Sequence, residues 1–81
     1  MGDVMEKSRI HSLNLYIGKN IRRARKEAGI SAEELGFRIG SSQQIISRYE
    51  TGKVHIKAAT LIVIAEVLDI PLSKLLPDKY V

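Results

Sequence analysis

Apolar residues recur at three- and four-residue steps along most of the chain, which puts them on single stripes of α-helices. The first such stretch predicts a helix over residues 13–28. Gly29 follows its last turn and suits a left-handed stop at the carboxyl end of a helix. The stripe consists of Leu13, Ile17, Ile21, Ala24 and Ala28.

The next apolar pair, Leu35 and Ile39, predicts a short second helix over residues 32–39. Ser31 precedes it at the N-cap and Glu34 follows three residues later, which is the pattern of a capping box. Gly40 ends this segment.

Ser42 is placed to cap a third helix over residues 43–50, which Gly52 terminates. Ile46, Tyr49 and Glu50 share its predicted inner face. The outer face is polar and consists of Gln43, Gln44, Ser47, Arg48 and Thr51.

Residues 57–68 predict a fourth helix, apolar at Leu61, Ile64, Ala65 and Leu68. Further apolar residues widen this surface, so we expect the helix to be buried on most sides. Pro71 begins a short fifth helix and Pro77 ends it. The additional apolar residues are Ile62, Val63 and Val67 in the fourth helix, and Leu72, Leu75 and Leu76 in the fifth.

The expected fold class is therefore all-α, a compact five-helix domain with one core. Residues 12–77 form the predicted domain. Residues 1–11 are polar and predict a flexible or partly helical arm, and residues 78–81 predict a tail.

The second and third predicted helices and the turn between them match a helix-turn-helix unit. Leu35, Ile39, Ile46 and Tyr49 are apolar where the two helices must be held to the core. Gly36 is small where the helices approach closely. Gly40 turns the chain, where a residue without Cβ adopts a left-handed conformation at little cost.

The stretch from Ile17 to Leu76 resembles the lambda-repressor-like, XRE-type family of regulators. This resemblance implies a five-helix domain whose third helix enters the major groove of a partly palindromic operator. Residues 42–50 are also similar to the core of small enterobacterial regulators encoded beside fimbrial operons. The matching residues are Ile17, Gly18, Ile21, Arg22, Arg25, Gly29, Ile30, Ser31, Glu34, Leu35, Gly36, Ile39, Gly40, Ser42, Gln43, Gln44, Ile46, Ser47, Glu50, Gly52, Leu61, Ile64, Ala65 and Leu68.

The chain departs from the family pattern at three positions. Ala32 stands where the family often has a Gln that helps to hold a phosphate, although the backbone amides at that helix start remain available. Ser41 replaces an apolar residue at the turn, and Thr51 replaces the commoner Asn before Gly52.

Four residues of the third predicted helix are candidates to read base edges. Gln bonds adenine in two places, whereas Arg48 suits either guanine or a phosphate. Ile45 is placed to contact a thymine methyl or to be partly buried. Alternatively, Gln43 and Gln44 are solvated surface residues that contact no base. The base-reading candidates are Gln43, Gln44, Ser47 and Arg48.

Phosphate contacts are expected around the ends of the third helix and from the first helix. Arg23 and Lys26 are weaker candidates, because a basic helix face is usually only solvated. The phosphate candidates are Ser42, Thr51, Lys53, Lys57 and Arg22.

The family resemblance implies an internal ion pair between Arg25 and Glu50, whose value is to set the angle of the recognition helix rather than to add stability. A homodimer surface is expected in the last third of the chain, although these residues could instead pack within one chain. The dimer candidates are Ile62, Pro71, Leu72, Leu76 and Tyr80.

Composition narrows the function further. With 81 residues and a net charge of +4, the chain suits one small domain that binds a polyanion. A domain this small often needs oligomerisation for stability, and the absence of cysteine excludes disulfides and thiolate metal sites. His11 and His55 lack metal-ligand spacing, so no metal or cofactor is expected, although His55 could contact a phosphate at low pH.

The chain carries no hydrolase triad and no phosphate-binding glycine loop, which argues against an enzyme. It also carries no signal peptide or membrane span, so we expect a cytoplasmic protein that does not bind membranes. The expected partners are a double-stranded DNA operator and a second copy of the chain. The alternative is an antitoxin-type module that binds a protein partner and autoregulates its promoter.

Overall fold

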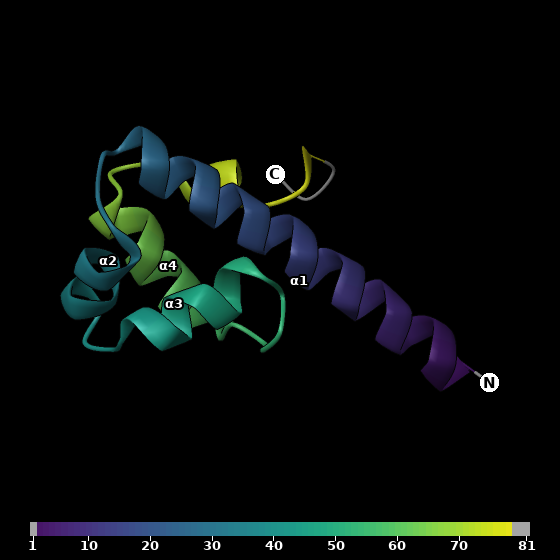
Figure 1. Cartoon of the computed structure of the whole chain (residues 1–81). Helices are drawn as coiled ribbons and strands as arrows, with labels where there is room; N and C mark the ends of the chain where they lie inside the picture. The colour runs from purple at the N-terminus through teal and green to yellow at the C-terminus, as the bar shows by residue number, and fades with distance from the viewer. Residues whose placement is uncertain (1, 79–81) are drawn as a thin grey trace.

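The computed structural model describes the backbone of residues 2–78 and the side chains of residues 7–78 (Figure 1). This part of the chain is entirely helical and contains no strand, which confirms the all-α prediction. Its elements are α1 (Gly2–Glu27), α2 (Ala32–Arg38), α3 (Gln43–Glu50), α4 (Ala58–Val67) and the 3-10 helix η1 (Leu72–Leu75).

Helix α1 is longer than predicted. It begins at Gly2 rather than near residue 13, and its amino-terminal half extends beyond the other helices (Figure 1). The side chains of residues 7–12 are all exposed, so this part of the helix has no apolar stripe from which it could have been recognised. The predicted flexibility of residues 1–11 stays a prediction.

Helices α2 and α3 begin at the predicted serine caps. Ser31 Oγ accepts a hydrogen bond from Glu34 N at 3.0 Å, and Ser42 Oγ accepts one from Ile45 N at 3.2 Å. Of the predicted capping box, only the hydrogen bond to Ser31 is present. The Glu34 carboxylate, which would form the other half, instead accepts a hydrogen bond from Arg38 Nε at 2.6 Å. An exposed pair one helical turn apart contributes only a few tenths of a kcal/mol, about 0.3–0.5.

The turn between α2 and α3 depends on two glycines. Gly40 has a φ of +73°, the left-handed conformation that the sequence predicts for it. A Cβ on Gly36 would lie 2.6 Å from the carbonyl carbon of Ser42 and 2.7 Å from its oxygen. The start of α3 therefore packs directly against the backbone of α2.

One apolar core joins the helices, and α4 together with its C-cap residue Leu68 supplies half of the buried core residues. The core consists of Ile21, Leu35, Ile46, Leu61, Ile64, Ala65, Leu68 and Leu75. The prediction that α4 is buried on most sides is wrong for the single chain, because Ile62 is 45% exposed and Val63 is 39% exposed. No described element of the same chain covers that side of the helix.

The predicted fifth helix is a four-residue 3-10 helix, so the described chain has four α-helices rather than five. Pro71 precedes it as predicted, and Leu75 is completely buried. Asn20 Nδ2 of α1 donates a hydrogen bond to the Leu75 carbonyl oxygen at 3.2 Å, which ties η1 to α1. None of the helices in the described range is long and apolar enough to cross a membrane.

Candidate nucleic-acid interface

The outer face of α3 is polar and exposed. Ile46 lies on the opposite side of the helix and is completely buried, so the helix is held to the core by that side. The exposed residues line one concave surface with a volume of about 390 Å³. Those residues are Gln43, Gln44, Ser47, Arg48, Thr51 and Lys53.

Helix α3 is positioned by two close backbone contacts. Gly36 admits its first turn, as described above. Gly18 of α1 admits its last turn, because a Cβ there would collide with the carbonyl oxygens of Tyr49 and Glu50. This packing role of Gly18 was not predicted from the sequence. The signal was a glycine inside a helical stretch, where it costs about 1 kcal/mol relative to alanine and so calls for a packing reason.

Arg25 and Glu50 form a bidentate ion pair behind α3. Arg25 Nε donates to Glu50 Oε2 at 2.7 Å and its second terminal nitrogen donates to Oε1 at 3.1 Å. The remaining terminal nitrogen donates to the Ile30 carbonyl oxygen at 3.0 Å. The two residues are 9% and 8% exposed, so α1, the loop before α2 and the end of α3 meet at one buried point.

The hydrogen bond to the Glu50 carboxylate raises the pKa of Arg25, and burial opposes this by a smaller amount. A raised basic pKa contributes stability below the unfolded value and loses it only as pH rises through the folded value. Because both values lie far above neutrality for Arg25, the guanidinium stays charged throughout the physiological range.

The phosphate candidates lie at several places around α3. Lys53 follows the helix and Lys57 is the N-cap of α4, and both are exposed. Arg22 is exposed on α1. Thr51 is exposed, but its hydroxyl donates to the Ser47 carbonyl oxygen at 2.8 Å, so it must rotate before it can donate to a phosphate. The Ser42 hydroxyl accepts from Ile45 N and keeps its own hydrogen for another acceptor.

Two further residues of α3, Ile45 and Tyr49, are partly buried. Ile45 is half-buried in the first turn of α3. Tyr49 packs against the core, as the sequence predicts.

His55 lies beside Asn14 of α1, and Asn14 Nδ2 donates a hydrogen bond to His55 Nδ1 at 3.1 Å. Among the described side chains, no group of three or more His, Asp or Glu residues is arranged to hold a metal ion.

The predicted dimer residues do not form one uniform surface. Ile62 and Pro71 are exposed, whereas Leu72 and Leu76 are half-buried and pack against the core. Tyr80 lies outside the described residues. The contribution of the two leucines to their own core limits the area that they can offer to a second copy.

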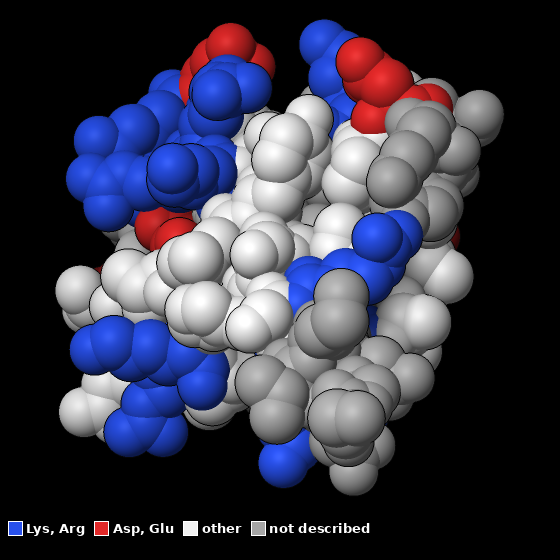
Figure 2. Space-filling view, turned by 90° about the vertical axis from the view of Figure 1, so that its right-hand side faces the viewer, with Lys and Arg blue, Asp and Glu red and all other residues white. Residues whose placement is uncertain are grey.

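Basic side chains lie in several separate groups on the face of the molecule seen from the amino-terminal end of α1 (Figure 2). Acidic side chains are fewer on this face. Lysine and arginine outnumber aspartate and glutamate by 13 to 9 in the whole chain. Such a distribution favours a polyanionic partner.

The profile of the helix-turn-helix family HTH_3, the XRE or lambda-repressor-like type, matches residues 21–75, which include the end of α1, all of α2, α3 and α4, and η1. The chain belongs to this family. The curated relatives that the chain matches are named as transcriptional regulators. The narrower likeness to fimbria-linked regulators stays a prediction.

One curated relative of this chain is an uncharacterised transcriptional regulator in the ATPase CF(0) region from Rhodospirillum rubrum. It is 35% identical over 69 residues, which cover 85% of this chain and 64% of the relative. An uncharacterised helix-turn-helix regulator from Sinorhizobium medicae is 31% identical over 93% of this chain and 54% of its own. The chain thus spans between about half and two thirds of the length of these relatives.

Two solved structures share the fold of this chain. The restriction-modification controller protein C.AhdI from Aeromonas hydrophila has a TM-score of 0.76 and 25% identity, over 80% of this chain and 94% of that protein. The P22 c2 repressor, solved in complex with a synthetic operator, has a TM-score of 0.68 and 28% identity, over 74% and 91%.

Proposed function

We propose that this protein is a sequence-specific transcriptional regulator that binds double-stranded DNA with α3 in the major groove. The observation that carries the proposal is the exposed polar side of α3, held on a scaffold whose opposite side is completely buried. The major groove admits an α-helix and displays a distinct donor and acceptor pattern for each base pair. The family and the operator complex of the P22 c2 repressor support the same role. A regulator of this kind acts in the bacterial cytoplasm, where the DNA is.

The base-reading residues of the proposal are Gln43, Gln44, Ser47 and Arg48, because they share the concave outer surface of α3. Lys53 and Lys57 contact phosphates after this helix, and Ser42 does so before it. Arg22 and Thr51 are secondary phosphate contacts, since Thr51 must first rotate its hydroxyl away from Ser47.

The active form in this proposal is a homodimer on a partly palindromic operator. Ile62 and Val63 leave an apolar side of α4 exposed in the single chain, and a second copy would cover it. Pro71, with the outer parts of Leu72 and Leu76, would continue this surface, and Tyr80 is retained as a candidate. A two-fold axis would place the two α3 helices about 34 Å apart, one turn of DNA.

Selection of bound fragments from random duplex DNA at near-physiological salt tests the function directly. The expected result is enrichment of one motif with two related half-sites about 10 base pairs apart. A dimer with about eight phosphate contacts should give a log-log salt slope near −7. Recovery of fragments without a common motif, or binding that does not respond to salt, would contradict the proposal.

Phe37 keeps a second candidate function open. It is 79% exposed on α2, although it is neither among the residues that line the α3 surface nor among the dimer candidates. A protein partner that covers this side chain would fit an antitoxin-type module that also binds its own promoter. Co-purification of a small protein with the wild type, lost in Phe37→Glu, would support this second function, and purification of the chain alone would count against it.

A further inference from the structure

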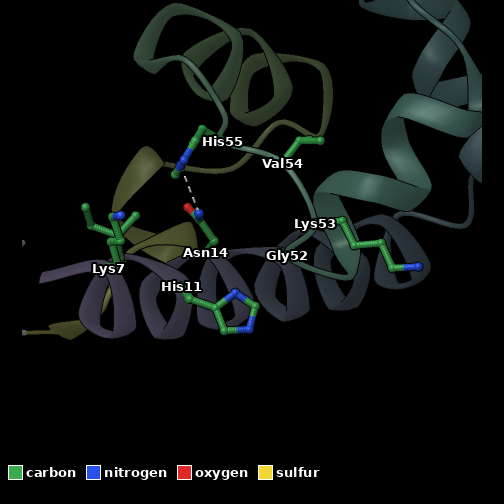
Figure 3. A pocket seen from close by; sticks show the side chains of 8 residues that line it. Lys7, His11, Asn14, Gly52, Lys53, Val54 and His55 are labelled. Carbon is green, nitrogen blue, oxygen red and sulfur yellow. Dashed lines mark hydrogen bonds between the residues drawn. The ribbon is translucent and has the colours of Figure 1, made fainter. Parts of the chain in front are cut away.

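A pocket lies between the extended part of α1 and the connector that follows α3 (Figure 3). It has a volume of about 270 Å³. Lys7, Ile10, His11 and Asn14 of α1 form one wall, and the connector from Gly52 to His55 forms the other. The positions on α1 are three and four residues apart, so they lie on one stripe of that helix.

The two walls are held together at their inner end. Asn14 Nδ2 donates to His55 Nδ1 at 3.1 Å, and Figure 3 shows these two side chains pointing toward each other. A Cβ on Gly52 would lie 2.8 Å from Leu15 Cδ2, so the connector rests closely on α1. With Nδ1 as the acceptor, His55 carries its ring hydrogen on Nε2, which can donate to a ligand.

The chemistry of the pocket suits an anion. Two lysines and two histidines line it, and none of the described residues that line it is acidic. Asn14, His11 and His55 add neutral or cationic N–H donors of the kind that bind phosphate oxygens. Only about half of this lining belongs to residues 21–75, where the family profile matches, because the wall on α1 precedes that range.

Lys53 connects this pocket to the surface of α3, because it lines both. DNA that lies along α3 would therefore continue toward Lys7 and His11. Each strand carries one phosphate per 3.4 Å of helix axis, so a backbone that passes α3 presents further phosphates beside it.

We propose that this pocket binds a phosphate group, and that the extended part of α1 thereby lengthens the DNA contact beyond the helix-turn-helix. Because Lys53 lines both the pocket and the α3 surface, the favoured source of this phosphate is the DNA backbone. With DNA as the source, the inference rests on the proposed function. A free phosphorylated small molecule would use the same chemistry.

The DNA source is tested with the double variant Lys7→Gln/His11→Gln, and Lys19→Gln is the matched control because Lys19 is exposed on the same helix but does not line the pocket. Both replaced side chains are exposed, so melting temperatures should stay equal. For a dimer that loses one phosphate contact per chain, the log-log salt slope should become shallower by about 2. Lys19→Gln should leave the slope unchanged.

A free phosphate source is tested by titrating the full chain with inorganic phosphate and a mononucleotide. The protein has two histidines and both line the pocket, so their imidazole resonances report binding directly. Saturable shifts of both resonances in the wild type, with the His55 shift lost in the double variant and an unchanged DNA salt slope, would assign the pocket to a small molecule. Absence of both the slope change and the shifts would overturn the inference.

The two proposals fail in different ways. If the wild type binds no specific DNA, the proposed function is wrong, and the imidazole titration still tests the pocket. If the wild type selects an operator and the double variant binds it with the same salt slope and no phosphate shifts, only the pocket inference is wrong.

Discussion

Arg25 and Glu50 carry opposite charges at a place that is almost closed to water. Removing two charges from water costs several kcal/mol, about as much as their attraction returns, so the pair adds little net stability. Arg25 donates three hydrogen bonds, two to Glu50 and one to the Ile30 carbonyl oxygen. These bonds join α1 to the loop before α2 and to the end of α3. We infer that the pair sets the orientation of α3.

Glu50→Ala tests this role. The variant leaves the Arg25 charge buried without its carboxylate, which should cost about 3–5 kcal/mol. For a domain of this size that corresponds to a fall in melting temperature of at least about 12 °C. Operator affinity, measured well below the lowered melting temperature, should also fall, although Glu50 lies away from the α3 surface. Glu50→Gln keeps the shape and isolates the charge. Unchanged affinity and melting temperature in Glu50→Ala would reject the role.

Arg48 and Lys53 lie on the same concave surface but should act differently. If Arg48 reads a base, Arg48→Ala should lose about 1–3 kcal/mol of operator binding and relax the preference at one position of the motif. Lys53→Ala should weaken operator and random DNA about equally and make the salt slope shallower. Binding measurements with both DNAs at two salt concentrations separate these effects. Wild-type operator binding by both variants would show that the assignment of the surface is wrong.

At the scale of elements, α2 and α3 pack through backbone at Gly36 and α1 and α3 pack through backbone at Gly18. Side chains can adjust by changing rotamers, whereas a carbonyl group moves only with its whole helix. The angle of α3 is therefore set by glycines on two neighbouring helices as well as by the apolar core.

Gly36→Ala measures this contact. Alanine usually stabilises a helix interior by about 0.5–1 kcal/mol relative to glycine. Here the added methyl would lie 2.6–2.7 Å from the Ser42 carbonyl group, so we expect a lower melting temperature instead. Glu33→Ala, at an exposed position of the same helix, is the control and should change little. Thermal unfolding followed by circular dichroism gives both values, and a stabilised Gly36→Ala would mean that the helices do not approach this closely.

At the scale of the whole molecule, the exposed side of α4 distinguishes a monomer from a dimer. A charge at Ile62 should be tolerated by the single chain, because the side chain is 45% exposed, but it should disrupt an apolar interface. Sedimentation of Ile62→Glu should show a shift from dimer toward monomer at concentrations where the wild type is dimeric. Phe37→Glu places the same charge on another exposed apolar residue and should leave the oligomeric state unchanged. A monomeric wild type would remove the basis for the proposed surface.

The helix-turn-helix was predictable from the sequence because its signals are local. Ser31 and Ser42 cap the helix starts, Gly40 reverses the chain, and the apolar positions of both helices repeat at helical spacing. The outer residues of α3 were predictable for the same reason, since residues one turn apart share a face whatever surrounds them.

The early start of α1, the close approach at Gly18 and the pocket beside His55 were not predictable in this way. An exposed helical extension has no apolar stripe, so periodicity is silent about it. The other two features join residues about 30 to 40 positions apart, such as Asn14 and His55, whose separation in the chain is 41.

The order of amino acids alone determined which segments are helical, where α2 and α3 begin and which side of α3 is polar, because each depends on residues within one or two turns of each other. Only the tertiary structure decided how far α1 extends, which side of α4 stays uncovered and which basic groups share a pocket. The exposed extension of α1 has no apolar stripe, and the other two outcomes depend on distances between separate helices, so a local pattern of apolar and polar residues encodes none of them.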